Sequence, residues 1–171
     1  RKESSAASDV YKRQGLASEA GMPAIADPGS SIVRAAHDLG LTVIPLVGPV
    51  SLMLALAASG LNGQSFAFVG YLPQDAAQRA TRLRELEKTA HLTGQSQIFI
   101  ETPYRNAALL DSAIQHLQPH TRLAVSWGLT LEIQELSQNV SAPVAQWRKN
   151  PTALKPAAEI MALPAVYTIG C

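Results

Sequence analysis

GMPAIADPG occupies residues 21–29, and it opens the part of the chain from which the fold class can be predicted. Glycines at Gly21, Gly29 and Gly48 allow a backbone to turn at positive φ or to approach a ligand closely. Asp27, followed by proline and glycine, is also typical of a turn that caps the next helix. On the residues alone, the turn is the simpler interpretation of Asp27, and a ligand-binding loop is the alternative.

Helices and apolar strands alternate on either side of a turn signal at Asn62-Gly63. We expect strands at Leu41–Leu46, Phe66–Tyr71, Gln97–Glu101, Arg122–Ser126, Leu131–Leu136 and Ala165–Gly170. The first expected helix follows Ser30 and ends before Gly40, and the second, at Ser51–Ser59, should be buried on most sides. Further helices are expected from an Asp75 cap, from a Thr102 cap to Leu117, and at Ser141–Lys149. Such alternation predicts an α/β layered fold that binds ligands at the carboxyl ends of strands.

The expected domains are residues 15–62 and 63–171. The first supplies only one strand and two helices, too few for a sheet covered on both faces, so we expect its amino-terminal half to be missing. Residues 1–14, RKESSAASDVYKRQ, are polar and patternless and resemble translated sequencing-adapter remnants. A disordered native tail is the alternative for this stretch.

The charge balance favours no nucleic-acid partner by itself. The chain has 14 Lys+Arg and 13 Asp+Glu, and residues 1–14 hold four of the former and two of the latter, so the remainder carries a net charge of −1. A local cluster on one helix could bind phosphates, or it could be a solvated helix face with acidic residues interspersed. The basic members are Arg79, Arg82, Arg84 and Lys88, and the acidic ones are Glu85 and Glu87.

The cysteine content and the hydropathy restrict the cellular compartment and the kinds of site that this chain can contain. Cys171 is the single cysteine, which excludes an internal disulfide framework or a cysteine-based metal site. No apolar run is long enough to span a membrane, and no secretory signal is present. We therefore expect a cytoplasmic protein that needs no metal and has no membrane partner.

Four linked motifs carry a family resemblance. The sequence GMPAIADPG is followed by GPVS from Gly48, ASGL from Ala58 and GYLP from Gly70. Their order and spacing resemble the tetrapyrrole-methylase superfamily, and within it the branch of the bacterial small-subunit rRNA ribose 2′-O-methyltransferases. The resemblance covers essentially residues 15–170 and continues more weakly through ETPYR, Glu101 to Arg105. It implies a two-domain αβα architecture, with the first domain incomplete here.

The resemblance also implies an S-adenosylmethionine cofactor and its contacts. Gly21, Met22 and Pro23 should lie along the methionine part of the cofactor, with Val50 and Ser51 on the neighbouring loop. From the second domain, Phe68 and Gly70 should approach it. Core packing for Val50 and Phe68, and a helix cap for Ser51, are the structural alternatives.

The resemblance says less about which residues contact the methyl acceptor. Glu101 and Arg105 are the candidates for contact with the methyl acceptor or for joining the domains, and an ordinary i, i+4 ion pair is the alternative. A ribose hydroxyl is a poor nucleophile, so a carboxylate that orients or deprotonates it would help, and Glu101 or Asp27 could serve. The expected partners are rRNA or the small ribosomal subunit, and a second copy in a homodimer.

Two departures from the family pattern leave the acceptor open. Glu19 and Met22 stand where the family has Asp and Thr, and Trp127 to Leu131 read WGLTL where the rRNA enzymes have R-E-L-T-K. Loss of both basic residues favours weak RNA binding or another acceptor. Three functions follow: rRNA ribose methylation, methylation of a tetrapyrrole-like small molecule, and a non-catalytic binding module. We further expect this chain alone to bind cofactor poorly and to be inactive.

Overall fold

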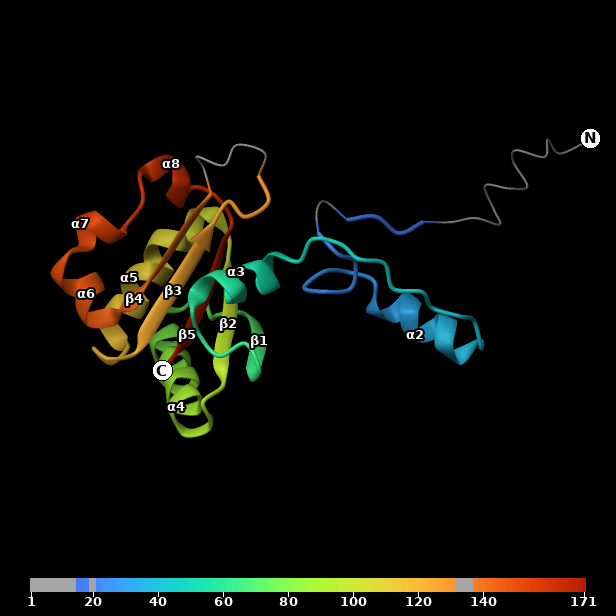
Figure 1. The fold of residues 1–171 in the computed structure, drawn as a ribbon, viewed down its shortest axis with the longest axis horizontal. Coiled ribbons are helices and arrows are strands. Elements are labelled where there is room, and N and C mark those ends of the chain that lie inside the picture. Colours follow the sequence, from blue (N-terminus) through green and yellow to red (C-terminus); the bar gives the residue numbers. More distant parts are fainter. Residues whose placement is uncertain (1–14, 19–20, 132–136) are drawn as a thin grey trace, which may run out of the picture. The chain divides into compact units, whose positions relative to one another are not determined.

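The structure is a computed structural model that describes residues 15–18, 21–131 and 137–171. The chain divides into two compact units, Arg1–Val50 and Ser51–Cys171. Both units are drawn in Figure 1. The division falls ahead of the boundary expected at residue 62, because the helix that follows Val50 packs on the sheet of the second unit.

The second unit contains a mixed five-stranded sheet with the order β1-β2-β5-β3-β4. Its strands are β1 (Phe66–Tyr71), β2 (Ser96–Glu101), β3 (Arg122–Trp127), β4 (Gln138–Pro143) and β5 (Ala165–Gly170). β1 and β2 are parallel, whereas β5 runs antiparallel to both β2 and β3, and β4 runs antiparallel to β3. Consequently β1, β2 and β3 run in the same direction, and their carboxyl ends lie at the same end of the sheet.

Helices α4 (Ala76–Thr93) and α5 (Asn106–His116) cover one face of this sheet. α4 begins where Asp75 Oδ1 accepts a hydrogen bond from the Gln78 backbone N–H at 2.9 Å, and it ends at Gly94 in the left-handed conformation. Leu83, Leu86, Leu109 and Leu110 from these helices form one apolar core with Phe99, Val125 and Tyr167 of the strands. The second unit therefore has a hydrophobic core of its own.

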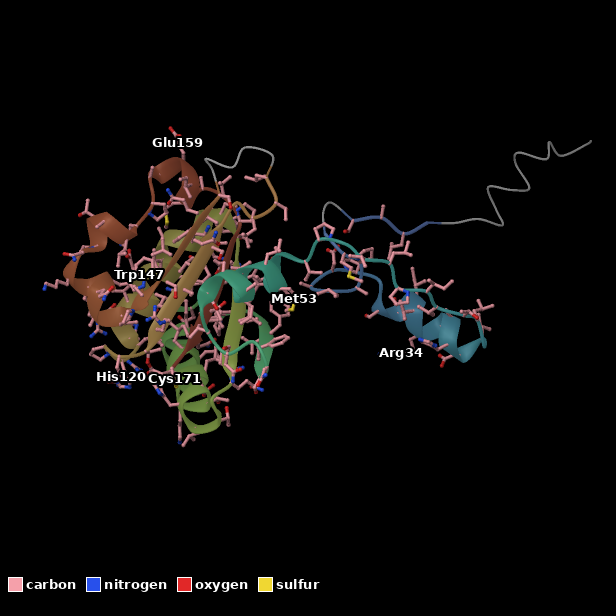
Figure 2. All side chains as sticks on the ribbon, in the orientation of Figure 1. Arg34, Met53, His120, Trp147, Glu159 and Cys171 are labelled. Atoms are coloured by element: carbon pink, nitrogen blue, oxygen red, sulfur yellow. The ribbon has the colours of Figure 1, made fainter. Side chains whose placement is uncertain are left out.

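Helix α3 (Ser51–Ser59) lies on the opposite face and contacts β3, β4 and β5 (Figure 1). Leu52, Ala55 and Leu56 are buried, whereas Met53 and Leu54 are exposed; Figure 2 labels Met53. The expectation that this helix is buried on most sides was therefore wrong for this chain, because only one of its faces meets the sheet.

The carboxyl-terminal part completes the second unit with three short helices, α6 (Val144–Lys149), α7 (Pro151–Leu154) and α8 (Ala158–Met161). The helix expected from Ser141 begins three residues later, because residues up to Pro143 belong to β4. Trp147 of α6, labelled in Figure 2, is fully buried. Its indole Nε1 donates to the Leu123 carbonyl at 3.1 Å. The expected strand at Leu131–Leu136 falls almost entirely outside the described residues.

The first unit contains helix α2 (Ser30–Asp38), which ends before Gly40 at φ 68° as expected. The buried strand expected at Leu41–Leu46 was wrong: these residues form no strand, and Leu41, Ile44 and Leu46 are exposed. A strand needs a partner for its backbone groups, and residues 15–18 and 21–50 contain no strand that could pair with it. None of these described residues is fully buried.

Across the described part of the chain, no helix combines the length and the apolar character needed to cross a membrane.

Candidate functional site

The segment from Gly21 to Gly29 is a tightly folded loop. Its φ angles are positive at Gly21 (85°), Ala24 (66°), Ala26 (59°) and Gly29 (142°). For alanine this conformation costs about 1–2 kcal/mol, so the loop stores strain of the kind that concentrates at ligand sites. A Cβ at Gly29 would lie 3.1 Å from the Ala24 nitrogen. A glycine at position 29 is thus required for the loop to close on itself.

A hydrogen bond joins this loop to the segment before Val50. The Met22 backbone N–H donates to the Pro49 carbonyl at 3.1 Å, and a Cβ at Gly48 would lie 3.8 Å from the Met22 side chain. Gly21 and Pro23 are exposed, and Met22 and Val50 are partly buried. The first unit therefore brings the predicted cofactor residues Gly21, Met22, Pro23 and Val50 onto two adjoining loops.

Asp27 does not cap helix α2. The N-cap residue is Gly29, and no side chain accepts a hydrogen bond from the first turn. Instead, Asp27 Oδ2 is buried and has no hydrogen-bond partner among the described residues. The capping interpretation of Asp27 was therefore wrong, and one of its carboxylate oxygens is left without a donor. Glu19, which precedes this loop, lies outside the described residues.

The remaining cofactor candidates belong to the second unit. Ser51 is the exposed first residue of α3, and Phe68 on the edge strand β1 is 36% exposed. Pairing between β1 and β2 shifts register between Phe68 and Tyr71, and Gly70 lies inside this bulge with φ 75°. Glycine suits this position because of its positive φ. A Cβ at Gly70 would meet nothing within 4 Å, so the space beside it is open.

Glu101 ends β2 and forms a buried ion pair with Arg105. Its Oε1 lies 2.7 Å from Arg105 Nη2 and 2.8 Å from Nε, and it also accepts from the Thr102 backbone N–H at 2.7 Å and the Thr102 hydroxyl at 3.2 Å. The side chain of Glu101 is 2% exposed and that of Arg105 is 19% exposed. The i, i+4 ion pair that the sequence offered as the alternative role of these two residues forms, and it fixes the turn that follows β2.

Trp127 of β3 and Glu101 of β2 pair with the same residue of the strand between them, β5. The sequence did not predict this relationship. Both residues pair with Ala165, from its two sides, so their side chains point to the same face. Trp127 is fully buried, and its Nε1 has no hydrogen-bond partner among the described residues. Trp127 therefore replaces the first basic residue of the family pattern by a buried aromatic side chain.

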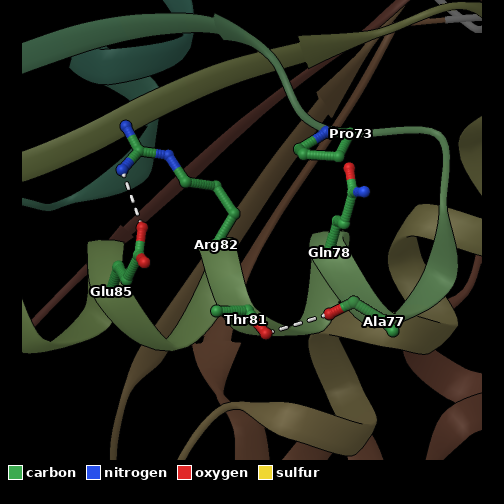
Figure 3. Close-up of a pocket in the computed structure, with 6 residues that line it drawn as sticks. All are labelled: Pro73, Ala77, Gln78, Thr81, Arg82 and Glu85. Carbon is green, nitrogen blue, oxygen red and sulfur yellow. Dashed lines mark hydrogen bonds and ion pairs between the residues drawn. The ribbon is translucent and has the colours of Figure 1, made fainter.

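A pocket of about 390 Å³ lies beside the first turns of α4, and none of the candidate cofactor or acceptor residues lines it (Figure 3). It is lined by Pro73, Ala77, Gln78, Thr81, Arg82 and Glu85. Arg82 and Glu85 form an ion pair at 3.1 Å with both side chains largely exposed. Glu87, expected on the solvated face of this helix, is buried and accepts from the Gln118 backbone N–H at 2.6 Å.

Among the residues that the structure describes, no three His, Cys, Asp or Glu side chains gather closely enough to hold a metal ion.

Comparison with curated proteins finds relatives over most of the chain. Ribosomal RNA small subunit methyltransferase I of Mesorhizobium japonicum is 37% identical over 121 residues, which is 71% of this chain and 40% of the relative. The protein of the same name from Halalkalibacterium halodurans is 35% identical over 137 residues, covering 80% of this chain and 46% of the relative. The chain spans less than half the length of these relatives. No family model matches it.

Comparison with solved structures identifies the fold. The methyltransferase CobJ aligns with a TM-score of 0.51 and 15% sequence identity, covering 88% of this chain and 61% of CobJ. At this identity the likeness concerns the fold alone. The chain is thus a homologue of the proteins named ribosomal RNA small subunit methyltransferase I, with an α/β fold of the tetrapyrrole-methylase type.

Proposed function

We propose that this protein is part of an S-adenosylmethionine-dependent methyltransferase that methylates a ribose 2′-hydroxyl of small-subunit rRNA. The observation that carries the proposal is the identity of 33–37% to relatives named for this rRNA, over 71–80% of the chain. Action on small ribosomal subunits would place the protein in the cytoplasm. A homodimer is part of the same proposal.

The donor side of the site fits the two loops of the first unit. We assign the methionine part of the cofactor to Gly21, Met22 and Pro23, with Val50 and Ser51 beside it. Positive φ at Gly21 and the bond from Met22 to Pro49 support this assignment, because they bring bare backbone to the surface of a closed loop. Phe68 and Gly70 are proposed to contribute from the second unit. The open space above Gly70 supports its part in this.

The bound cofactor supplies a methyl group on a sulfonium, which is a good leaving group. The protein then has to align the acceptor hydroxyl and exclude water. Asp27 fits the orienting or deprotonating role better than Glu101 does. Asp27 has a buried carboxylate oxygen without a donor, whereas Glu101 Oε1 already receives the Arg105 guanidinium and both Thr102 donors. We therefore place Glu101 and Arg105 as positioning residues on the acceptor side.

The first domain is proposed to be incomplete in this chain. Leu41, Ile44 and Leu46 are 58%, 74% and 77% exposed, although their sequence is that of a buried strand. Burial of one such side chain is worth about 1.5–3 kcal/mol, so neighbouring strands would stabilise this segment strongly. It follows that the 171-residue chain alone should bind the cofactor poorly and should not transfer methyl groups.

Binding of S-adenosylhomocysteine tests this assignment. The chain should be extended with the preceding segment of the Halalkalibacterium relative, and calorimetry should then detect binding that the unextended chain lacks. If the extended chain does not bind, both enzymatic proposals fail and a non-catalytic binding module is left.

A small-molecule acceptor is the second candidate. It is favoured by residues 127–131, where WGLTL carries no basic side chain and Trp127 is buried. Without basic residues this segment offers no charged side chain to an RNA phosphate. Label transfer to a tetrapyrrole but not to ribosomal subunits would favour this candidate.

A further inference from the structure

Tyr104 is the most exposed aromatic side chain in the described part of the chain. It is 80% exposed, compared with 57% for Tyr71 and 36–38% for the two phenylalanines of β1. Tyrosine is enriched at binding interfaces, because its ring offers a large apolar surface and its hydroxyl a polar end. The residues around Tyr104 therefore indicate which kind of partner it suits.

Tyr104 is held on a rigid turn. It is the middle residue of the short 3-10 helix η1 (Pro103–Arg105), and Pro103 fixes the backbone at its start. The Arg105 backbone N–H donates to the Thr102 carbonyl at 3.0 Å. Beyond the turn, buried Asn106 donates from Nδ2 to the carbonyls of Met161 at 3.1 Å and Leu163 at 2.6 Å. The ring is thus presented on a backbone that is anchored at both ends.

A second planar group stands beside the ring. The Arg105 guanidinium carbon lies 5.3 Å from the centre of the Tyr104 ring, within the range of a cation–π contact. The guanidinium is held by Glu101 through Nη2 and Nε, so it cannot swing away without breaking a buried ion pair. Tyrosine rings and arginine planes are the surfaces on which unpaired RNA bases stack.

The turn also lies where ligands bind in this fold class. It directly follows β2, whose last residues pair alongside the end of the parallel strand β1 at Tyr71 and Ile100. In α/β sheets, ligands bind at the carboxyl ends of the strands. Tyr104 thus stands next to Glu101 and Arg105, the proposed positioning residues of the acceptor side.

We propose that Tyr104 stacks on an unpaired base of the RNA substrate and so helps to hold the acceptor strand. This inference rests on the proposed rRNA function. An aromatic ring with a fixed guanidinium plane beside it suits a nucleobase, because the flat face of the base can stack on such planar groups.

RNA binding by single-residue variants tests the proposal. The probe is a short fluorescein-labelled single strand copied from small-subunit rRNA, measured by anisotropy at one fixed salt concentration. Tyr104→Ala should weaken binding of the single strand about tenfold, within the range for loss of one stacked base. Tyr104→Phe keeps the ring and should bind like the wild type. A duplex of the same sequence should show no difference between Tyr104→Ala and the wild type.

Leu92→Ala is the matched control, because Leu92 is also highly exposed (74%) but lies near the end of α4. It should leave binding unchanged. Equal binding of the strand by Tyr104→Ala and the wild type would overturn the inference, as would an equal loss in Tyr104→Phe or no binding by the wild type. The rRNA function itself is judged separately, by methyl transfer to ribosomal subunits, so the two can fail independently.

Discussion

One oxygen of Glu101 receives two nitrogens of Arg105, Nη2 at 2.7 Å and Nε at 2.8 Å. The carboxylate side chain is 2% exposed, so its charge is separated from water and depends on this guanidinium for compensation. The pair ties the end of β2 to the turn that carries Tyr104. Its integrity therefore affects both the stability of the second unit and the geometry of the proposed acceptor side.

Arg105→Ala should destabilise the chain by about 3 kcal/mol, because it leaves a buried carboxylate without its cation. Glu101→Gln keeps an acceptor for the Thr102 donors and should cost less. Urea unfolding followed by circular dichroism measures both. Lys155→Ala breaks the ion pair with Asp111, whose side chain is 63% exposed, and should cost less than about 1 kcal/mol. Equal losses for Arg105→Ala and Lys155→Ala would contradict the buried-pair interpretation.

The two buried tryptophans should respond differently to the same substitution. Trp147 Nε1 donates to the Leu123 carbonyl, whereas buried Trp127 Nε1 has no partner among the described residues. Trp→Phe removes similar volume at each site but breaks a hydrogen bond only at Trp147. Trp147→Phe should therefore cost about 1–2 kcal/mol more in urea unfolding than Trp127→Phe. The reverse order would mean that Trp127 Nε1 has a partner in solution.

Tyr167 should make stability fall at high pH. Burial, followed by the negative charges of Glu101 and Asp111, raises the pKa of the Tyr167 phenol far above its usual value near 10. Below pH 10 the phenol is neutral in both states, so its contribution to stability is complete. Above pH 10 only the unfolded chain ionises this group, and stability falls by about 1.4 kcal/mol per pH unit. Tyr167→Phe should lose this part of the slope between pH 10 and 11, and an unchanged slope would contradict the assignment.

Gly29→Ala tests the Gly21–Gly29 loop, and Gly40→Ala is its matched control. Both have positive φ, but a Cβ at Gly29 would lie 3.1 Å from the Ala24 nitrogen, whereas one at Gly40 would meet nothing within 4 Å. In the extended chain, Gly29→Ala should weaken S-adenosylhomocysteine binding about tenfold, because strain of about 1–3 kcal/mol displaces the loop. Gly40→Ala should have little effect on calorimetric affinity. Equal affinities in the two variants would argue against a cofactor role for the Gly21–Gly29 loop.

Much of the second unit could be predicted from local patterns. β1, β2 and β5 follow from apolar runs, and α4 follows from Asp75 and Gln78 three residues later. β4 was missed because its sequence, QNVSAP, is polar and ends in proline, as edge strands often do. Leu41–Leu46 was predicted as a strand from its own composition. Pairing decides whether such a segment forms a strand, and composition cannot supply the partner.

The candidate site was predictable only in part. The glycine loop and the Glu101–Arg105 pair could be found from spacing, but spacing could not choose between capping and a free carboxylate for Asp27. Glu101 and Trp127 lie on either side of Ala165 because β5 is placed between β2 and β3. This strand order is a long-range feature that no local pattern encodes. Tyr104 likewise becomes conspicuous only once its exposure is known.

Methyl transfer to ribosomal subunits tests the central claim most directly. The extended chain should be incubated with labelled S-adenosylmethionine and small subunits from a strain that lacks the corresponding methyltransferase. We predict label in the rRNA, located on a ribose 2′-oxygen by nuclease digestion, and a loss of at least tenfold in Asp27→Asn, which changes the carboxylate that we propose orients the hydroxyl. Label confined to small molecules, or none in subunits despite bound cofactor, would contradict the account.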